Sequence, residues 1–246
     1  MRIRLTIEYD GTCYCGWQLQ ASEDTVQARI EAVLEILFNQ KIRVEAAGRT
    51  DAGVHALGQV AALDAPRRFS PAELVRALNA MLPRDIAVRE AVEVSGDFDP
   101  RRDACARVYE YRIINRELRS AFEYRYAWQI REPLDLAAME MAAARFLGEH
   151  DFAAFRTLGT ETKTTIRRIH RSRWERRPDL LLYRVEGSSF LRRMVRSMVA
   201  AMVEVGRGRM TVDAIGALLS GGDRAQTRAA APPCGLFLVE VRYPQL

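Results

Sequence analysis

Apolar and polar side chains alternate along the first residues of the chain, with apolar residues at every second position from Ile3 to Tyr9. This period of two predicts a strand with one face in the core. The pattern then changes to apolar residues three or four positions apart between Asp24 and Asn39, which predicts a helix. Asp24 is the expected N-cap of this helix, with Gln27 at the reciprocal capping position.

The same patterns predict the remaining elements. Strands are expected on both sides of residues 48–55 and over residues 86–94, 107–115, 165–176, 180–186 and 236–243, with a hairpin formed by 165–176 and 180–186. Helices are expected after the capping box Ser70–Glu73, from Asp135 to Gly148, from Ser188 or Ser189 to Val205, and after Thr211. Because strands and helices mix without regular strand–helix–strand repeats, we expect the α+β class with a largely antiparallel sheet.

A polar segment over residues 95–102 contains Gly96 and Pro100 and separates two stretches of similar design. Each stretch mixes strands with helices, so we expect two α/β halves, residues 1–100 and residues 101–246. The 246 residues, of which 48% are hydrophobic, are enough to bury a substantial core in one large or two small domains.

The charge balance favours an anionic partner. The chain has 37 Lys and Arg against 32 Asp and Glu, a formal net charge of +5. Lysine occurs only at Lys41 and Lys163, so nearly all the cations are arginines, which present a planar fork to phosphate and stack on bases. This bias fits an RNA-binding protein, and a high genomic GC content would produce it as well.

The four cysteines, Cys13, Cys15, Cys105 and Cys234, lack the spacing of a metal site. Scattered cysteines without a signal peptide indicate a reducing cytosol. The longest apolar stretch, residues 194–205, is interrupted by charged and polar residues and cannot span a bilayer. We therefore expect a cytoplasmic protein with no metal and no membrane segment.

The densest group of reactive side chains lies in Gly48–His55, between two apolar stretches that are typical of strands. Asp51 is two residues from Arg49, whose positive charge favours the ionised carboxylate. A carboxylate held as an anion suits a nucleophile or a base. Asp-Ala-Gly is also a common turn sequence, however, and an Arg/Asp pair is often only a structural ion pair.

Two tyrosines form a second group of candidates. The strand expected over residues 107–115 places Tyr109 and Tyr111 on one face. Tyrosines in strands usually do no more than cover a sheet. A tyrosine ring can also stack on an extruded pyrimidine while its hydroxyl stays polar. The residues alone leave both interpretations open.

Arginines in the last long helix form a third group. Arg196 lies within the apolar face of the helix expected over residues 188–205, and a buried guanidinium requires an acidic partner. Arg192 and Arg193 lie in the same predicted helix. They are either phosphate contacts or solvated charges.

These motifs carry a resemblance to a known family. Gly48–His55 followed by Ala56 resembles the signature loop of the tRNA pseudouridine synthase A (TruA) family, written Arg-Thr-Asp-x-Gly-Val-His-Ala. Arg107–Tyr111 is similar to the family's Arg-x-Tyr-x-Tyr strand, and Met194–Arg196 to its Met-Val-Arg motif. Further matches occur at residues 9–20, 151–156 and 235–238, so the resemblance extends from residue 3 to residue 244.

The chain departs from the family pattern at a few positions. Cys13 and Cys15 stand where the family usually has polar or aromatic residues, and Glu110 stands where a basic residue is common. Residues 98–101 read Phe-Asp-Pro-Arg in place of Phe-His-Ala-Arg. These positions lie outside the signature loop and bear on local RNA contacts rather than on catalysis.

The resemblance implies the pseudouridine synthase fold, with two halves that form a central basic cleft. It implies an isomerase that converts uridine to pseudouridine in tRNA, on the 3′ side of the anticodon stem-loop, without a metal or cofactor. Asp51 would attack C1′ of the ribose or remove the C2′ proton, and the sequence leaves both routes open. Tyr109 would stack on the base or help to remove the C5 proton, and Arg196 would pair with Asp51.

The resemblance also implies which residues bind the substrate. Besides Tyr109, these are Arg49, which would hold the flipped nucleotide or its gap in the stem, and Arg192 and Arg193. We expect His55 to be structural, because loop histidines often only bind backbone. The implied partners are the anticodon stem-loop of tRNA and a second copy of the chain, a homodimer that shapes the RNA cleft.

Two other classes of function remain open. A non-catalytic RNA-binding module would show basic and aromatic residues but would not require Gly-Arg-Thr-Asp as a unit. A glycosidase or nucleosidase would normally use two carboxylates, and the loop at residues 48–55 offers one. Release of free uracil would identify such a hydrolase, whereas isomerisation leaves the mass of the RNA unchanged.

Overall fold

The structure is a computed structural model that describes residues 1–157, 162–221 and 230–244. Its chain contacts divide it into two compact units. The first unit consists of Met1–Cys105 and Phe237–Leu246, and the second of Ala106–Leu236. The last residues, which the sequence placed with the C-terminal half, thus belong to the first unit. The predicted division of the chain into halves at residue 100 stays a prediction.

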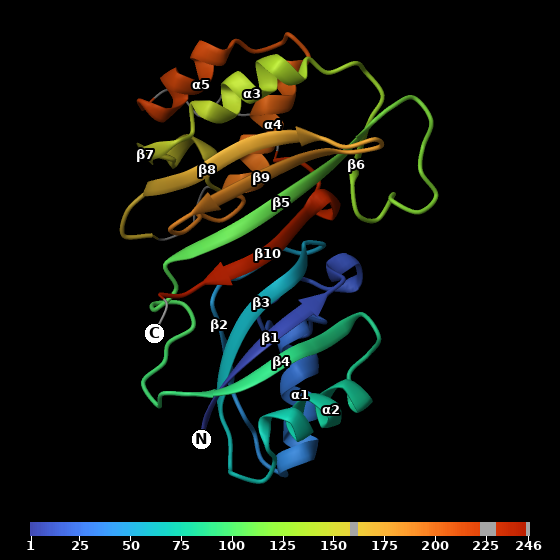
Figure 1. The fold of residues 1–246 in the computed structure, drawn as a ribbon, viewed down its shortest axis with the longest axis vertical. Coiled ribbons are helices and arrows are strands. Elements are labelled where there is room, and N and C mark those ends of the chain that lie inside the picture. Colours follow the sequence, from blue (N-terminus) through green and yellow to red (C-terminus); the bar gives the residue numbers. More distant parts are fainter. Residues whose placement is uncertain (158–161, 222–229, 245–246) are drawn as a thin grey trace. The chain divides into compact units, whose positions relative to one another are not determined.

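Within the described residues, the first unit has five strands (Figure 1): β1 (Arg2–Tyr9), β2 (Val44–Ala46), β3 (His55–Asp64), β4 (Ile86–Val94) and β10 (Leu236–Arg242). β1 lies between β4 and β3 and is antiparallel to both, while β10 runs parallel to β3. β2 pairs antiparallel with β3. Every second residue of β1 is buried, which confirms the predicted alternation from Ile3 to Tyr9.

The first unit also contains the α-helices α1 (Val26–Phe38) and α2 (Pro71–Met81). The predicted capping box of Ser70 and Glu73 is present at the start of α2. The predicted cap of α1 was wrong by one residue, because Thr25 caps the helix. The carboxylate of Asp24 instead binds Arg29, with oxygens 2.8 and 2.6 Å from two guanidinium nitrogens. The Gln27 amide does not cap either; it donates to the Val44 carbonyl at 3.1 Å.

The described part of the second unit also has five strands: β5 (Ala106–Asn115), β6 (Trp128–Ile130), β7 (Gly148–Asp151), β8 (Ile166–Arg176) and β9 (Leu181–Gly187). The order β5-β9-β8-β7 is antiparallel throughout, and the short β6 pairs parallel with β5. The hairpin predicted over residues 165–186 is confirmed by β8 and β9.

The helices of the second unit are α3 (Leu136–Ala144), α4 (Met194–Gly206) and α5 (Val212–Leu219). Thr211 caps α5, and Asp135 caps α3 through the N–H of Ala138, as predicted. α3 ends at Ala144 rather than at Gly148, which is the first residue of β7. Short 3-10 helices lie in the connections of both units: η1 (Gly11–Cys13), η2 (Ala153–Phe155) and η4 (Pro233–Gly235).

The start of α4 differs most from its prediction, because the helix begins at Met194 rather than near Ser188. The Ser188 N–H donates to the Arg168 carbonyl at 3.0 Å, and the Ser188 carbonyl accepts from Arg107 at 2.9 Å. These long-range bonds hold Ser188 in the connection from β9. Arg193 then takes a left-handed conformation, with φ 61°, immediately before the helix.

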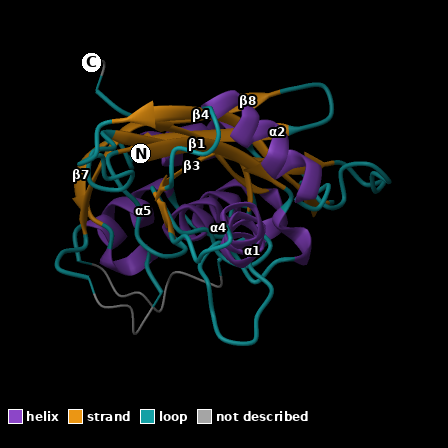
Figure 2. Cartoon of the chain, turned by 90° about the horizontal axis from the view of Figure 1, so that it is seen from below, coloured by secondary structure: helices purple, strands orange, loops and turns teal. Residues whose placement is uncertain are grey.

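The helices of the second unit lie on one face of its strands (Figure 2). Two side chains of β8 mark that face: Ser172 donates to the Ala143 carbonyl of α3, and the Trp174 indole N–H lies 3.2 Å from the Met202 sulfur of α4. Both units therefore combine antiparallel strands with helices, which confirms the predicted α+β class. Across the described ranges, no helix has the length and apolar character needed to cross a membrane.

Candidate active site

The loop between β2 and β3 carries Asp51, which is partly buried, and Arg49, which is exposed. Between them, the side chain of Thr50 is buried and its hydroxyl lies 2.8 Å from the Tyr9 hydroxyl. The Thr50 carbonyl accepts from the Trp17 N–H at 3.2 Å. The residue that precedes Asp51 is thus fixed through both its side chain and its backbone by residues of another segment.

The segment that follows β1 supports the loop by close backbone contact. The Gly53 N–H donates to the Tyr14 carbonyl at 3.3 Å. A Cβ added to Gly16 would lie 2.5 Å from the Thr50 carbonyl oxygen, and Gly16 has a φ of +89°. A Cβ added to Gly11 would lie 2.0 Å from the Val54 carbonyl oxygen. Only glycine permits this approach, so the backbone on both sides of Asp51 is held in place.

His55 ends the loop as the first residue of β3, and its exposed fraction is 1%. Its Nδ1 lies 3.1 Å from the Gly11 backbone nitrogen and 3.1 Å from a carboxylate oxygen of Asp10. Its ring stacks on Phe237 with 4.7 Å between the ring centroids. These contacts support the interpretation of His55 as a structural residue, since they occupy one nitrogen and one face of the ring.

The two tyrosines of β5 share a face but differ in their surroundings. Tyr111 is fully buried, and its hydroxyl donates to the Pro232 carbonyl at 2.8 Å. Burial raises the pKa of Tyr111, which remains a neutral core residue. Tyr109 keeps 9% of its surface exposed and packs against Phe190 in a T-shaped arrangement, with 5.1 Å between the ring centroids. Phe190 was not predicted as a site residue.

Arg196 is the third residue of α4 and is buried. Its Nε donates to the Ala231 carbonyl at 2.6 Å, and its own carbonyl accepts from the Ala231 N–H at 3.1 Å. Its charge also acts on Cys234: burial raises the pKa of that thiol, and Arg196 opposes the rise. The sequence predicted Asp51 as the partner of Arg196. That pairing stays a prediction, because the two residues belong to different units.

Arg192 and Arg193 are exposed, as binding residues must be, but they do not lie on the helix. They precede it, and the Arg192 carbonyl accepts from the Thr157 N–H at 3.2 Å. The predicted site residues therefore form two groups. Asp51 and Arg49 lie on one loop of the first unit, and Tyr109 belongs to the second unit with the arginines at 192, 193 and 196.

Sequence reasoning missed the residues that support these groups. Tyr9 and Gly16 lie in segments that match the family pattern, and Phe190 lies beside the Met-Val-Arg motif, yet none of them received a role. Gly16 could have been found from its place in the family match over residues 9–20, where it begins the sequence Gly-Trp-Gln. No comparable signal identifies Ala231, whose contribution is made by its backbone.

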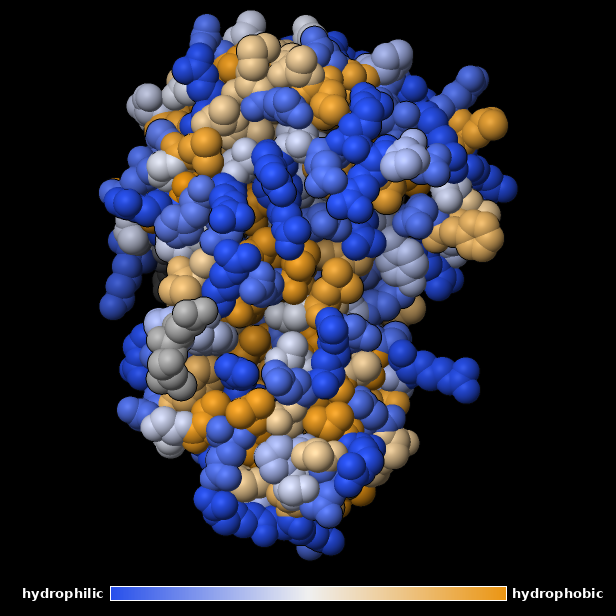
Figure 3. All heavy atoms as spheres, viewed as in Figure 1, coloured by the Kyte–Doolittle hydropathy of each residue, from blue (hydrophilic) through white to orange (hydrophobic). Residues whose placement is uncertain are grey.

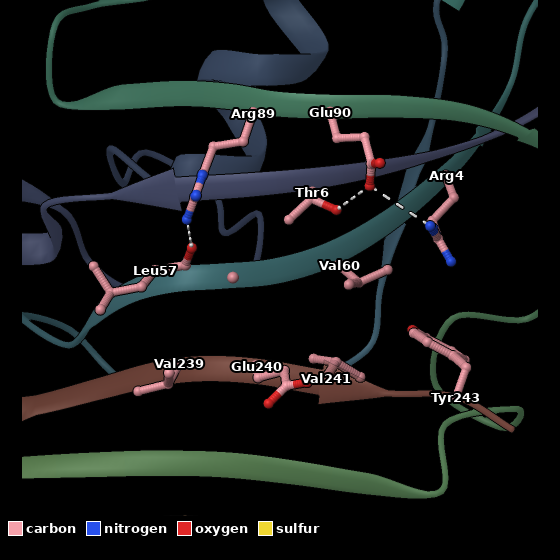
Figure 4. Close-up of a pocket in the computed structure, with 11 residues that line it drawn as sticks. Arg4, Thr6, Leu57, Val60, Arg89, Glu90, Val239, Glu240, Val241 and Tyr243 are labelled. Atoms are coloured by element: carbon pink, nitrogen blue, oxygen red, sulfur yellow. Dashed lines mark hydrogen bonds and ion pairs between the residues drawn. The ribbon is translucent and has the colours of Figure 1, made fainter. Parts of the chain in front are cut away.

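A hollow of about 460 Å³ lies in the first unit, among side chains of β1, β3, β4 and β10 (Figure 4). The Thr6 hydroxyl donates to Glu90 at 3.3 Å, and Arg4 lies 3.6 Å from the same carboxylate. Arg89 donates to the Leu57 carbonyl at 3.2 Å. These polar groups bind one another, and none of the predicted site residues lines the hollow, so we do not count it as part of the candidate active site.

The described residues contain no group of three or more His, Cys, Asp or Glu side chains that could hold a metal ion. All four cysteines are free thiols. The Cys15 thiol donates to a carboxylate oxygen of Glu23 at 2.8 Å, which raises the pKa of the thiol. Cys13, in η1, is exposed.

Comparison with known proteins supports the sequence resemblance. Residues 5–101 and 142–244 match the model of a family described as tRNA pseudouridine synthase. A protein of Geotalea daltonii named tRNA pseudouridine synthase A is 45% identical over 241 residues, which cover 98% of this chain and 99% of that protein. A protein of the same name from Myxococcus xanthus is 44% identical over 243 residues, 98% of this chain and 92% of the relative.

Similarity to solved structures is much weaker. An H/ACA RNP bound to a substrate RNA containing 2′-deoxyuridine aligns with 82% of this chain at 10% identity and a TM-score of 0.35. This chain spans about half, 53%, of the chain that it matches there. A likeness of this strength supports no conclusion about the site.

Proposed function

Because the chain belongs to the tRNA pseudouridine synthase family, we propose that it isomerises uridine to pseudouridine in tRNA, on the 3′ side of the anticodon stem-loop. The observation that carries this proposal is the placement of Asp51. It lies partly exposed on a loop whose backbone is held by Tyr14, Gly16 and Trp17, while Tyr9 binds the Thr50 hydroxyl. Such fixation is what a reacting carboxylate requires.

The reaction balances without an outside reagent. The bond between N1 of uracil and C1′ of the ribose breaks, the base turns, and its C5 forms a bond to C1′. One proton leaves C5 and one is gained at N1. Nothing is oxidised and no group moves to another molecule, so the chemistry requires only acid–base and nucleophilic groups.

We assign the catalytic roles to three residues. Asp51 attacks C1′ or removes the C2′ proton, and both routes are consistent with a fixed carboxylate. Arg196 keeps that carboxylate ionised and oriented. Tyr109 stacks on the uracil or helps to remove the C5 proton. Its T-shaped contact with Phe190 restricts the orientation of the ring, which suits either role.

Binding must supply the free energy that extrudes the base, roughly a few kcal/mol. The exposed guanidinium groups of Arg49, Arg192 and Arg193 suit contacts with phosphates or with the gap that the base leaves.

We further propose that the enzyme is a cytoplasmic homodimer whose partner subunit shapes the RNA cleft. Sedimentation of the purified protein, alone and with tRNA, measures that assembly.

Chemical mapping of pseudouridine in unmodified tRNA, before and after addition of the purified protein, tests the proposed function. We expect new pseudouridines only on the 3′ side of the anticodon stem-loop, with no free uracil released. Release of uracil would indicate a hydrolase. Binding of tRNA without any modification would indicate a non-catalytic RNA-binding module.

A further inference from the structure

The connection between β5 and β6, residues 116–127, is about twice as long as a typical connection between elements. It extends away from the strands of the second unit (Figure 1). The family match stops at residue 101 and resumes at residue 142, so it leaves this segment out. We call residues 116–127 the β5–β6 arm; the catalytic roles assigned above give it no part.

The β5–β6 arm exposes three large apolar side chains within seven residues. The exposed fraction is 77% for Leu118, 87% for Phe122 and 59% for Tyr124. Hydrophobic atoms reach the surface on this arm in the space-filling view (Figure 3). A single exposed apolar residue is ordinary, but a cluster that includes two aromatic rings is typical of a binding surface.

Hydrogen bonds hold the arm in this exposed conformation. At its base, the Asn115 amide donates to the carbonyls of residues 130 and 132, and Gln129 donates to the Arg116 carbonyl. Near its tip, the Ser120 hydroxyl accepts from the backbone N–H of Phe122 and of the next residue at 3.3 and 3.1 Å. The backbone that carries the rings is therefore held by hydrogen bonds, which lowers the entropic cost of binding.

Arginines accompany the aromatic rings. The Arg125 guanidinium lies 5.4 Å from the centre of the Tyr124 ring and donates to the Tyr124 hydroxyl at 2.7 Å. Arg119 is exposed and forms no ion pair within the ranges that the structure describes. Exposed aromatic rings next to arginine are the combination with which proteins bind the unpaired bases of RNA, since the ring stacks on a base and the guanidinium binds phosphate.

The arm continues the strand that carries Tyr109. Tyr109 lies near the start of β5 and the arm begins after Asn115, roughly 20 Å further along the strand at about 3.4 Å per residue. An RNA that places one nucleotide at Tyr109 can reach the arm with another. Resting on the proposed function, we infer that Phe122 and Tyr124 form a stacking platform for unpaired bases of the bound tRNA, away from the isomerised uridine.

The test compares wild-type protein with the double variant Phe122→Ser/Tyr124→Ser, which removes both rings from exposed positions. A second variant, Phe122→Tyr/Tyr124→Phe, keeps the rings and exchanges the hydroxyl. Met141→Ser is the matched control, because Met141 is also an apolar residue of the second unit and is 58% exposed. Filter binding to tRNA at several salt concentrations is measured for each, together with single-turnover modification.

We expect the double serine variant to bind tRNA at least about 25-fold more weakly, because stacking on an aromatic ring contributes roughly fivefold or more per base and two rings are removed. The ring-exchange variant binds as the wild type does, and so does Met141→Ser. The slope of affinity against salt stays unchanged, because the lost contact is not ionic. In single-turnover modification, the enzyme concentration needed for half-maximal rate rises by the same factor as the dissociation constant.

Equal tRNA affinity of the wild type and the double serine variant overturns the inference. So does a loss that sedimentation traces to dissociation of a dimer, since the arm would then bind a second copy of the chain. If wild-type protein binds tRNA but forms no pseudouridine, the proposed isomerisation fails, and the comparison of affinities still decides the role of the arm.

Discussion

The loop between β2 and β3 (the Asp51 loop) and helix α4 each carry a charged residue of the candidate site, Asp51 and Arg196, but these residues are held in different ways. The Asp51 loop is held from outside by residues 9–17, through hydrogen bonds to Thr50 and through the close contact at Gly16. Arg196 is held by its own helix and by two hydrogen bonds to Ala231. A loop therefore depends on distant segments for its shape, whereas a helix supplies most of its own.

Replacement of Gly16 by alanine tests this dependence most severely. The added Cβ would meet the Thr50 carbonyl at 2.5 Å in a backbone conformation with φ +89°. We expect the free energy of unfolding to fall by about 3 kcal/mol and the modification rate by at least about a hundredfold, because Asp51 moves with Thr50. Gly96→Ala is the control, since nothing lies within 4 Å of its Cβ position. Equal rates for the two variants would show that the loop does not need this support.

Arg196→Met should have the next largest effect. It removes the donor to the Ala231 carbonyl, which costs about 1–3 kcal/mol of stability. If Arg196 also orients Asp51, the single-turnover rate falls by about a hundredfold at saturating tRNA. Arg196→Lys keeps the charge without the planar fork and should recover part of the rate. A full rate in Arg196→Met, once its stability is accounted for, would refute the pairing with Asp51.

Tyr109→Phe separates the two roles of that tyrosine. The ring and its edge contact with Phe190 remain, so tRNA affinity should be unchanged. We expect the modification rate to fall by roughly tenfold, the contribution of a hydroxyl that assists proton transfer. An undiminished rate would leave stacking as the role of Tyr109, and Tyr109→Ala would then lower the rate where Tyr109→Phe does not.

Ser70→Ala should have the smallest effect, because Ser70 caps α2 and lies outside both groups of site residues. Loss of the cap costs about 1 kcal/mol of stability, and we expect the modification rate to stay the same.

The Ser70 N–H and hydroxyl lower the pKa of Glu73 in the folded state. The resulting contribution to the free energy of unfolding is present above the usual pKa of glutamate and is lost as the pH falls through the pKa of Glu73 in the folded protein. The difference in unfolding midpoint between variant and wild type should therefore shrink in acid; a constant difference would contradict the capping box.

Much of the fold could be predicted because local rules determined it. The alternation in β1 was confirmed, and the capping box fixed the start of α2. The errors arose where long-range contacts decided the outcome. Asp24 lost the cap of α1 to Thr25 because its carboxylate binds Arg29. Ser188 does not start α4 because its backbone bonds to β8 and to Arg107.

The sequence and the family resemblance proposed residues for the candidate site, which stay a prediction, but not the residues that support them. Residue types around Asp51 allowed either a reactive carboxylate or a structural ion pair, and the family resemblance gave Asp51, Tyr109 and Arg196 their roles. The contacts of Thr50 with Tyr9 and of Tyr109 with Phe190 join residues far apart in the sequence. Periodicity and motifs do not show which residues far apart in the sequence come into contact, so these supporting residues were identified only in the structure.

Asp51→Asn provides the most direct test of the central claim, that a fixed carboxylate at position 51 carries the reaction. The amide keeps nearly the same shape and removes the negative charge. We predict that pseudouridine formation in tRNA falls by about a thousandfold or more, while tRNA affinity and unfolding midpoint stay close to those of the wild type. Near-normal turnover by Asp51→Asn would contradict the account, whatever the other variants show.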